Sequence, residues 1–431
     1  MSKSPEPGSR IAVVGGGVAG IVAAYLLQGR YLVTLFEADT RLGGHTNTVS
    51  IESGPDSGLE VDTGFIVLND QTYPTFHAFL AKLGVAVRTS DMSFSYESRE
   101  SGFYYAGTTL DGLFSQRRNI VSPKFYRFLN EVAGFCREGR RLLSGGSAGK
   151  PGPSEVTLKQ FLDQGRYSQF MRESYLLPMA AAIWSAPLDQ ILDFPAITLL
   201  RFFSNHGLLS LRDRPNWQTV IGGSHSYIQA FVKSFKGSIR CGAPVELVSC
   251  GIDSALVQVR GQAAEKFDAV VIAAHADQAL QIIKEPNSLE QELLGSWSYQ
   301  QNLALLHTDR SVMPKDRRAW ASWNYIRERG AAPGRPVFVS YHMNRLQGFA
   351  ARSEYFVTLN AESSIDPKSV IGRFNYQHPV FDAQSVGTQN RLSGMQGLDR
   401  RYFCGSYFGY GFHEDAVSSA VKVGRLLEVK L

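Results

Sequence analysis

The segment spanning residues 11–37 constrains the fold of this chain more than any other part of the sequence. Residues 11–14 form a short apolar, β-branched run, the pattern of a strand buried on both faces, and residues 31–37 form a second such run. Between them lie a glycine-rich turn, Gly-Gly-Gly-Val-Ala-Gly at 15–20, and an Ala- and Leu-rich stretch at 21–27 that predicts a helix. A strand, glycine turn, helix and strand in this order predict a βαβ unit.

The glycines of this turn have the G-x-G-x-x-G spacing of a dinucleotide-binding motif. The first glycine permits the tight turn, the second lets the backbone approach a pyrophosphate, and the third lets the helix pack on the strand. The helix N-terminus offers N–H groups to the phosphates, and an acid at the end of the second strand can bind the ribose. The predicted cofactor-binding residues of this unit are Gly15, Gly17, Val18, Ala19, Gly20, Glu37 and Ala38. The alternative is a glycine-rich turn beside a solvated Glu37.

The rest of the chain predicts one nucleotide-binding domain that is interrupted by insertions. Residues 73–217 have a helical pattern, whereas 239–248, 255–259 and 269–273 read as strands, the second suited to an antiparallel hairpin and the third to a buried parallel strand. A strand at 402–405 and a helix at 413–427 end the chain, and the Gly-, Ser- and Pro-rich stretch 144–154 predicts a surface loop. We expect residues 1–72, 218–275 and 371–431 to form the nucleotide-binding domain, and 73–217 and 276–370 the substrate domain.

Composition narrows the functional classes. The chain has 431 residues, of which 44% are hydrophobic, and Lys and Arg exceed Asp and Glu by 44 to 39, a net charge of +5. This mild basicity does not predict a nucleic-acid partner. The four cysteines include no C-x-x-C pair, which argues against a disulfide framework and a metal site and suits a reducing cytoplasm. Because the sequence has no signal-peptide pattern and no long apolar run, we expect a cytoplasmic protein without a membrane span.

Further motifs carry a family resemblance. Arg41-Leu42-Gly43-Gly44 resembles the second glycine motif of the two-dinucleotide-binding-domain flavoproteins, and the strand at 402–405 with the following helix resembles their last FAD-binding segment. The chain is similar to the superfamily of amine oxidases, phytoene desaturases and protoporphyrinogen oxidases. This resemblance implies an α/β fold, with a Rossmann-like FAD domain and an inserted mixed α+β substrate domain, and it implies FAD as the cofactor. It adds these cofactor-binding residues: Arg41, Gly43, Gly44, His45, Val245, Ala273, Gly405, Glu414, Asp415 and Ala416.

Two positions depart from the pattern of these flavoproteins. His45 stands where many amine oxidases carry Arg or Lys, and Ser406 follows Gly405 where relatives often carry an acid. Cys404 is expected in the core, not as a covalent flavin attachment.

A narrower resemblance rests on four strings: VDTGFIVLNDQTYP (61–74), SDMSFS (90–95), NYQHPVF (375–381) and CGSYFGYGFHED (404–415). They resemble the flavin oxidoreductases that accompany cyclopropane fatty acid synthases. This implies an FAD-dependent fatty acid desaturase of lipid metabolism that transfers a hydride from an acyl chain to flavin N5. The acyl chain would be either unmodified or already methylated. The alternatives are an oxidase of a small amine and a flavin-binding partner of a lipid methyltransferase.

The candidate catalytic residues are Tyr376, His378, Phe412 and His413. The resemblance places Phe412 on one side of the flavin and the segment with Tyr376 and His378 on the other. Desaturation also needs a proton acceptor, for which the candidates are Tyr376, His378, His413 and Glu414. For the histidines the alternative is a hydrogen-bonded core residue, and for Glu414 a cap of its own helix, with Asp415 complementing the helix dipole.

Two stretches concentrate positive charge, residues 113–141 with a local charge of +5 and 310–330 with +4, and aromatic residues are interleaved in both. Cations with aromatics suit the surface of an anionic bilayer. The lipid substrate that the resemblance implies, a membrane phospholipid, favours peripheral binding at the inner membrane face. Nucleic acid also suits the charge, but no recognition motif accompanies it. The alternative is a solvated face of helices.

Overall fold

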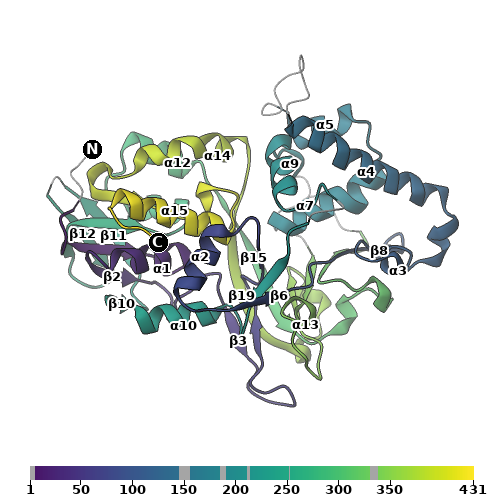
Figure 1. Cartoon of the computed structure of the whole chain (residues 1–431), viewed down its shortest axis with the longest axis horizontal. Helices are drawn as coiled ribbons and strands as arrows, with labels where there is room; N and C mark the ends of the chain where they lie inside the picture. The colour runs from purple at the N-terminus through teal and green to yellow at the C-terminus, as the bar shows by residue number, and fades with distance from the viewer. Residues whose placement is uncertain (1–4, 145–155, 185–190, 211–213, 252, 331–337) are drawn as a thin grey trace.

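A computed structural model describes residues 5–144, 156–184, 191–210, 214–251, 253–330 and 338–431. The chain forms two lobes, a nucleotide-binding lobe that contains both termini and a substrate lobe, joined by long strands at the centre (Figure 1). The surface loop predicted at 144–154 lies outside the described residues except for Ser144.

A five-stranded parallel sheet in the order β10-β2-β1-β14-β20 organises the nucleotide-binding lobe. Its strands are β1 (Arg10–Val14), β2 (Leu32–Phe36), β10 (Ser238–Arg240), β14 (Ala269–Ile272) and β20 (Arg401–Phe403). The sequence predicted one strand at 239–248, whereas β10 ends at Arg240 and a second strand, β11 (Val245–Cys250), begins after a turn.

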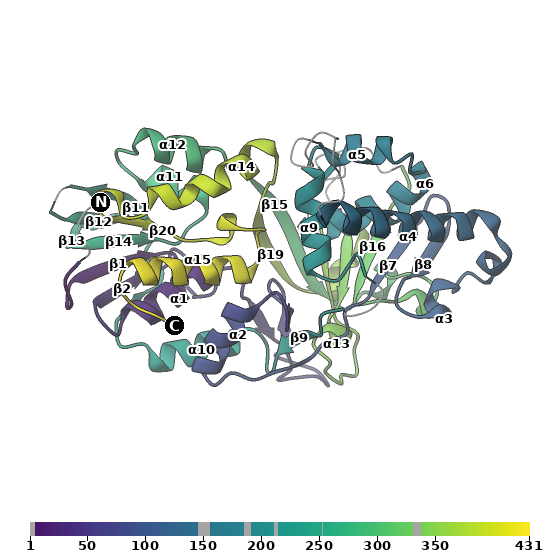
Figure 2. The same cartoon turned by 45° about the horizontal axis from the view of Figure 1, so that its top comes forward.

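The alternating side chains of β1 explain why residues 11–14 of this strand are all apolar. Ile11 and Val13 pack in one core with α1 (Val18–Leu27) and α15 (His413–Leu426), which lie side by side on one face of the sheet (Figure 2). Ala12 and Val14 face a second core that includes residues of a three-stranded antiparallel sheet of β11, β12 (Ala255–Val259) and β13 (Glu265–Phe267). A strand covered on both faces needs apolar residues at every position, as the sequence predicted.

A seven-stranded mixed sheet in the order β19-β15-β18-β17-β16-β7-β8 forms the floor of the substrate lobe. Its strands are β19 (Val370–Pro379), β15 (Tyr299–His307), β18 (Phe356–Leu359), β17 (Val339–His342), β16 (Trp323–Arg327), β7 (Phe94–Ser98) and β8 (Phe103–Ala106). Smaller sheets pair β3 (Thr48–Ser50) with β4 (Glu60–Asp62), and β9 (Trp217–Val220) with β5 (Leu68–Asn69) and β6 (Val87–Thr89).

Helices pack over this floor and against the nucleotide-binding lobe (Figure 2). In the substrate lobe they are α3 (Leu110–Leu113), α4 (Pro123–Leu143), α5 (Leu158–Gln164), α6 (Gln169–Met171), α7 (Leu177–Trp184), α9 (Ala196–Asn205) and α13 (Met343–Leu346). The others are α2 (Pro74–Lys82), α10 (His225–Ser234), α11 (Ala276–Ile282), α12 (Ser288–Gly295) and α14 (Ala383–Thr388). Within the described residues, no helix combines the length and the apolar character needed to cross a bilayer.

The α/β fold class is confirmed, but two regional expectations differ from the structure. The stretch 73–217, predicted to be helical, also contributes β6, β7 and β8, because β7 pairs in parallel with β16, a strand more than two hundred residues away. The division into domains also differs locally: α2 packs against α15, and β19 pairs with β15 in the substrate sheet.

Candidate active site

One large cavity, of about 1400 Å³, joins the two lobes. It extends from the carboxyl ends of the parallel strands, where open α/β sheets bind their ligands, to the seven-stranded sheet. It is larger than a typical small-molecule pocket of about 300–1000 Å³, as a site for a dinucleotide plus a substrate requires. Most of the predicted site residues line it: Gly15, Gly17, Val18, Ala19, Glu37, Ala38, Arg41, Gly43, Gly44, His45, Val245, Ala273, Tyr376, His378, Gly405, Phe412, His413 and Ala416.

The glycines of the first motif have different surroundings. A Cβ on Gly15, which has φ +106°, would lie 2.6 Å from the carbonyl oxygen of Ala273, and a Cβ on Gly20 would lie 1.8 Å from that of Gly15. Gly20 does not line the cavity, so its need for glycine comes from helix–strand packing. A Cβ on Gly17 would meet nothing within 4 Å and would occupy the cavity itself.

Gly17 is also the N-cap of α1 and provides no side-chain cap. The first N–H groups of α1 therefore have no partner within their own helix and lie at the cavity. A helix N-terminus of this kind binds phosphate.

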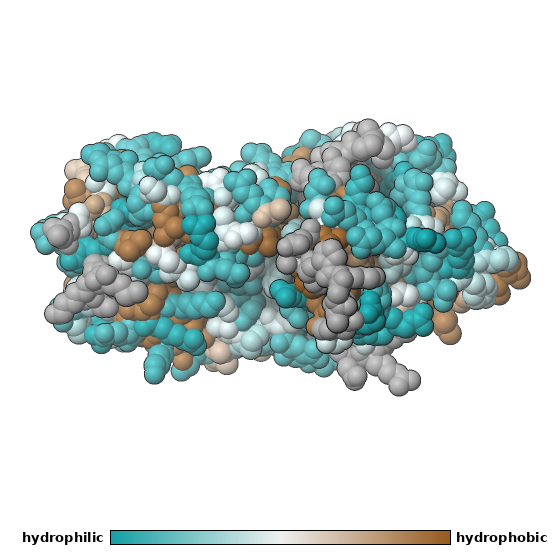
Figure 3. Space-filling model, turned by 90° about the horizontal axis from the view of Figure 1, so that it is seen from above, coloured by the Kyte–Doolittle hydropathy of each residue, from teal (hydrophilic) through white to brown (hydrophobic). Residues whose placement is uncertain are grey.

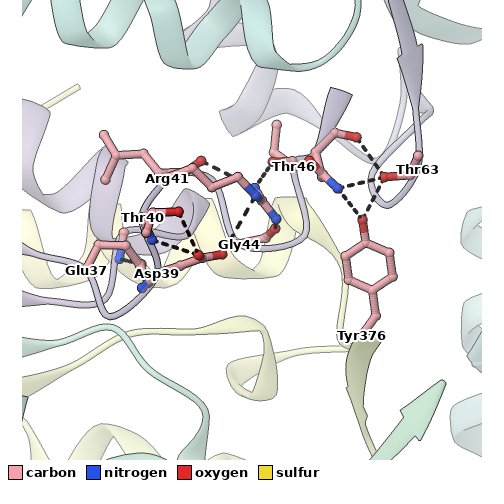
Figure 4. Close-up of polar contacts among 11 residues, drawn as sticks. Glu37, Asp39, Thr40, Arg41, Gly44, Thr46, Thr63 and Tyr376 are labelled. Atoms are coloured by element: carbon pink, nitrogen blue, oxygen red, sulfur yellow. Dashed lines mark hydrogen bonds and ion pairs between the residues drawn. The ribbon is translucent and has the colours of Figure 1, made fainter. Parts of the chain in front are cut away.

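Glu37 lies beside this turn and is held by backbone donors (Figure 4). One carboxylate oxygen accepts the N–H of Gly16 at 2.6 Å, and the other accepts the N–H of Asp39 at 2.8 Å. The carboxylate is therefore fixed at the cavity wall instead of moving freely in solvent. Its role with a ribose stays a prediction.

The second glycine motif packs directly on the first. The N–H of Gly43 donates to the carbonyl of Gly16 at 2.8 Å, and Gly43 forms a β-bridge with Gly17. The Arg41 guanidinium donates to the carbonyls of Gly44 and Thr46, both at 3.0 Å, and so holds the loop in shape (Figure 4). Both glycine loops therefore present backbone to the same part of the cavity.

Two acids at the C-terminal helix lie outside the large cavity. Glu414, predicted to bind the cofactor with a cap of its own helix as the alternative, accepts the N–H groups of Thr75 (3.0 Å) and Phe76 (2.8 Å) and so caps α2. Asp415 accepts the N–H of Phe412 at 2.9 Å, and burial raises its pKa to about 6. These contacts give both acids a structural role where the sequence predicted cofactor binding.

The hydrogen bonds around His378 determine its tautomer. The Leu303 N–H donates to the side-chain oxygen of Asn360, so the Asn360 amide nitrogen donates to the oxygen of Asn302 (2.8 Å). The Asn302 nitrogen therefore donates to Nδ1 of His378 at 3.0 Å, and the ring proton lies on Nε2. Burial lowers the pKa of His378 to about 4, so this ring is neutral, with Nδ1 accepting from Asn302 and Nε2–H as a donor.

The hydroxyl of Tyr376 also has hydrogen-bond partners within the protein. Its hydroxyl accepts from the Asn47 amide at 3.1 Å and lies 2.8 Å from the Thr63 hydroxyl, which itself donates to the Asn47 carbonyl (Figure 4). The Tyr376 proton is thus directed to Thr63. Burial raises the pKa of this phenol above its ordinary value of 10.

His413 is the remaining imidazole among the proton-acceptor candidates. Its ring stacks on Phe65 with centroids 3.7 Å apart, and its Nε2 lies 3.0 Å from the Thr46 hydroxyl. Burial lowers its pKa to about 3, which keeps the ring neutral. Phe412, the neighbouring residue, stacks on Phe202 across the lobe boundary with centroids 4.9 Å apart.

A histidine cluster at the centre of the cavity was not predicted as a unit. His45 lies 5.2 Å from His378 and 6.2 Å from His275, measured between ring centroids, and all three line the cavity. Burial, and then the neighbouring His378 and His275, lower the pKa of His45 well below 6.5. His275 lies two residues after Ala273, which the resemblance included among the cofactor-binding residues without the histidine.

The residues fit the FAD implied by the resemblance. Two glycine loops leave backbone open to the cavity, and buried ring nitrogens of His45 and His275 have no protein partner among the described residues. Among these residues no group of His, Cys, Asp and Glu is arranged to hold a metal ion. Cys404, predicted to be core, is buried, and desolvation raises the pKa of its thiol to about 12.

Comparison with known proteins decides the family. Residues 18–333 match the family model described as flavin containing amine oxidoreductase. The chain belongs to this family. It is therefore a flavin-dependent oxidoreductase with FAD as its cofactor, as predicted.

Individual relatives match over short segments or in fold. A segment of 43 residues is 58% identical to protoporphyrinogen oxidase 2, chloroplastic/mitochondrial, of Arabidopsis thaliana, and it spans 10% of this chain and 8% of that protein. A putrescine oxidase variant superposes with a TM-score of 0.71 at 16% identity, covering 98% of this chain and 99% of that one. The CLA-producing fatty acid isomerase from P. acnes gives 0.67 at 14% identity, covering 97% and 98%. At these identities the two structures show the shared fold.

Proposed function

We propose that this FAD-dependent oxidoreductase dehydrogenates a fatty acyl chain of a membrane phospholipid. The acyl chain is either unmodified or already methylated. The observation that carries the proposal is the character of the cavity in the substrate lobe. Its walls there are largely aromatic and aliphatic, and they include Met92, Phe94, Met179, Ile183, Trp184 and Phe202. Such a surface suits a methylene chain, which gains free energy from burial without needing polar partners.

Charge in the same region argues against a small amine as substrate. Among the described lining residues, the acids are Glu37, Asp39, Glu246 and Asp91, and the first three lie in the nucleotide-binding lobe. Asp91 is already paired with Arg345 at 3.0 Å. A protonated amine entering the substrate region would therefore lose its hydration without gaining a free carboxylate as a partner. Burying an unpaired charge in this way costs free energy.

The fold neighbours support a lipid as well as an amine substrate. One neighbour is a fatty acid isomerase and another a putrescine oxidase, so the shared architecture accommodates both classes. The apolar lining of this cavity is what favours the acyl chain.

Dehydrogenation of a CH₂–CH₂ unit to CH=CH removes one hydride and one proton. FAD, when bound, accepts the hydride. The residues of the chain orient the acyl segment by apolar contact, exclude water, and provide a proton acceptor. We assign that role to His413, a cavity-lining ring that burial keeps neutral. Its Nε2 lies against the Thr46 hydroxyl, which can donate or accept, whereas Nδ1 of His378 accepts from an amide that can only donate and the Tyr376 proton is directed to Thr63.

Turnover with product analysis tests this assignment. Purified holoenzyme is mixed with phospholipids that carry saturated, unsaturated or methyl-branched chains, with oxygen or a dye as electron acceptor, and the released fatty acids are analysed by mass spectrometry. We expect a product lacking two hydrogen atoms, and a His413→Gln variant with much lower kcat and unchanged lipid binding. The matched control is His307→Gln, a buried histidine outside the cavity. Oxidation of putrescine but of no lipid would contradict the proposal.

A further inference from the structure

The far end of the substrate lobe exposes a set of large hydrophobic side chains. Val121 is 81% exposed and Leu110 77%, the highest values for large hydrophobic residues in the described part of the chain. Ile120 and Tyr126 are about half exposed, at 48% and 49%. These four residues define the apolar tip. Figure 3 shows hydrophobic atoms at this end of the lobe.

The apolar tip is a fixed surface. The Tyr126 hydroxyl donates to the Ile120 carbonyl at 2.9 Å, and the Phe114 N–H donates to the Leu110 carbonyl at 3.0 Å. The rings of Phe114 and Tyr126 are 6.3 Å apart, centroid to centroid. The segments before and after the turn of 3-10 helix at Arg117–Val121 are therefore tied together, and the apolar side chains have stable positions.

Basic side chains surround the apolar tip. The exposed cations are Arg117, Arg118, Lys124 and Arg127. Two acids lie nearby: Asp111 pairs with Arg117 at 2.5 Å, and Glu131 with Arg127 at 3.0 Å, which leaves a local excess of positive charge. Elsewhere in the basic stretch 113–141, Arg140 donates to the Leu209 carbonyl and Arg141 pairs with Glu138, whereas Arg137 is exposed.

The apolar tip also adjoins the cavity. Gly107 and Thr108 are exposed and line the cavity, and Thr109, the next residue, caps α3, which begins at Leu110. The rim of the cavity and the apolar tip are thus consecutive along the chain.

We propose that the apolar tip docks into an anionic phospholipid bilayer, with its hydrophobic side chains at the acyl boundary and its cations at the phosphates. Exposed aliphatic and aromatic residues ringed by Arg and Lys complement this surface in both polarity and charge. An acyl chain then enters the cavity past Gly107 and Thr108. The proposed docking depends only on the exposed residues of the apolar tip, whereas the proposed entry route also depends on the acyl-chain function proposed above.

Co-sedimentation of the holoenzyme with vesicles tests the docking without any turnover. Vesicles of phosphatidylglycerol and phosphatidylcholine are compared with vesicles of phosphatidylcholine alone. We expect binding to the anionic vesicles that weakens with salt, and a decrease of about tenfold or more in the Leu110→Glu/Val121→Glu variant. A charge-reversal variant, Arg118→Glu/Lys124→Glu, should also weaken binding to the anionic vesicles.

Matched controls carry the same changes on the other lobe. Leu32→Glu/Leu426→Glu replaces exposed hydrophobic residues, and Lys233→Glu/Lys236→Glu reverses exposed charges; both should bind vesicles like the parent. Unchanged binding in both tip variants would overturn the docking, as would a tip variant that changes only the oligomeric state in sedimentation velocity. If the protein binds the vesicles as expected but does not oxidise detergent-dispersed lipid, the docking proposal is supported and the proposed acyl-chain function is contradicted.

Discussion

The contrast between Gly17 and Gly20 makes the cofactor site testable by one added methyl group. In Gly17→Ala, the new Cβ meets no protein atom within 4 Å, and the backbone angles, φ −70° and ψ 179°, suit any residue. The apoprotein should therefore keep its free energy of unfolding to within about 1 kcal/mol. The methyl group does, however, occupy the space at the N-terminus of α1 where a pyrophosphate would approach.

The expected loss is the value of one charge-assisted hydrogen bond between a backbone N–H and a phosphate. That is about 1.5–3 kcal/mol, or roughly a 10- to 150-fold higher Kd for FAD. Isothermal titration of apoprotein with FAD measures the Kd, and urea unfolding of the same preparation measures stability. If Gly17→Ala binds FAD within twofold of the parent, the phosphate assignment is wrong.

Gly20→Ala is the matched comparison, because it adds the same methyl group on the other side of the turn. Its Cβ would lie 1.8 Å from the Gly15 carbonyl oxygen, so the helix must move away from the strand. We expect a loss of about 1–3 kcal/mol or more in the free energy of unfolding, and weaker FAD binding as a consequence. Equal stability of the two variants would contradict the packing role of Gly20.

Three further predictions follow from particular contacts. Glu37→Gln loses the ability to accept both backbone N–H groups at full strength and should raise the Kd for FAD about tenfold or more, measured by the same titration. Glu290→Ala leaves the Arg401 guanidinium, only 3% exposed, with Asp399 (3.1 Å) as its one remaining acidic partner among the described residues, and should lower the free energy of unfolding by about 3 kcal/mol in urea. Glu292→Ala, on an exposed pair, should leave it unchanged. The pKa of His413 is about 3 in the folded chain and ordinarily near 6.5, so between these pH values the unfolded chain binds a proton that the folded chain does not. The free energy of unfolding therefore falls as the pH drops from about 6.5 towards 3. His413→Gln should reduce that slope by up to about 1.4 kcal/mol per pH unit, measured by urea unfolding at several pH values.

Local sequence signals predicted the parts of the fold that are built from neighbouring residues. The first strand, glycine turn and helix follow from β-branched runs and glycine spacing, and the structure places them at Arg10–Val14 and Val18–Leu27. The second glycine motif was predicted by its resemblance to that of flavoproteins, and the structure shows why Gly43 is a glycine, since it has φ +120°.

Contacts between distant segments were beyond the sequence patterns. Phe94–Ser98 becomes a strand because it pairs with Trp323–Arg327, and neither segment alone indicates that partner. Glu414 was predicted to bind the cofactor or else to cap its own helix, yet it caps α2, because α2 and α15 pack together. The hydrogen bond between Asn302 and His378 likewise depends on the pairing of two strands, β15 and β19. Their register places Gln300 opposite His378, so Asn302, two residues further along β15, lies close enough to bind the ring.

Anaerobic titration of the bound flavin distinguishes an acyl-lipid substrate from an amine substrate. Holoenzyme is mixed without oxygen with phospholipid vesicles of defined acyl composition and, separately, with putrescine and other small amines, while the visible absorbance of the flavin is recorded. We expect bleaching by an acyl lipid and none by the amines. Bleaching by an amine alone would contradict it and favour an amine oxidase, and bleaching by neither would favour a flavin-binding partner of another enzyme.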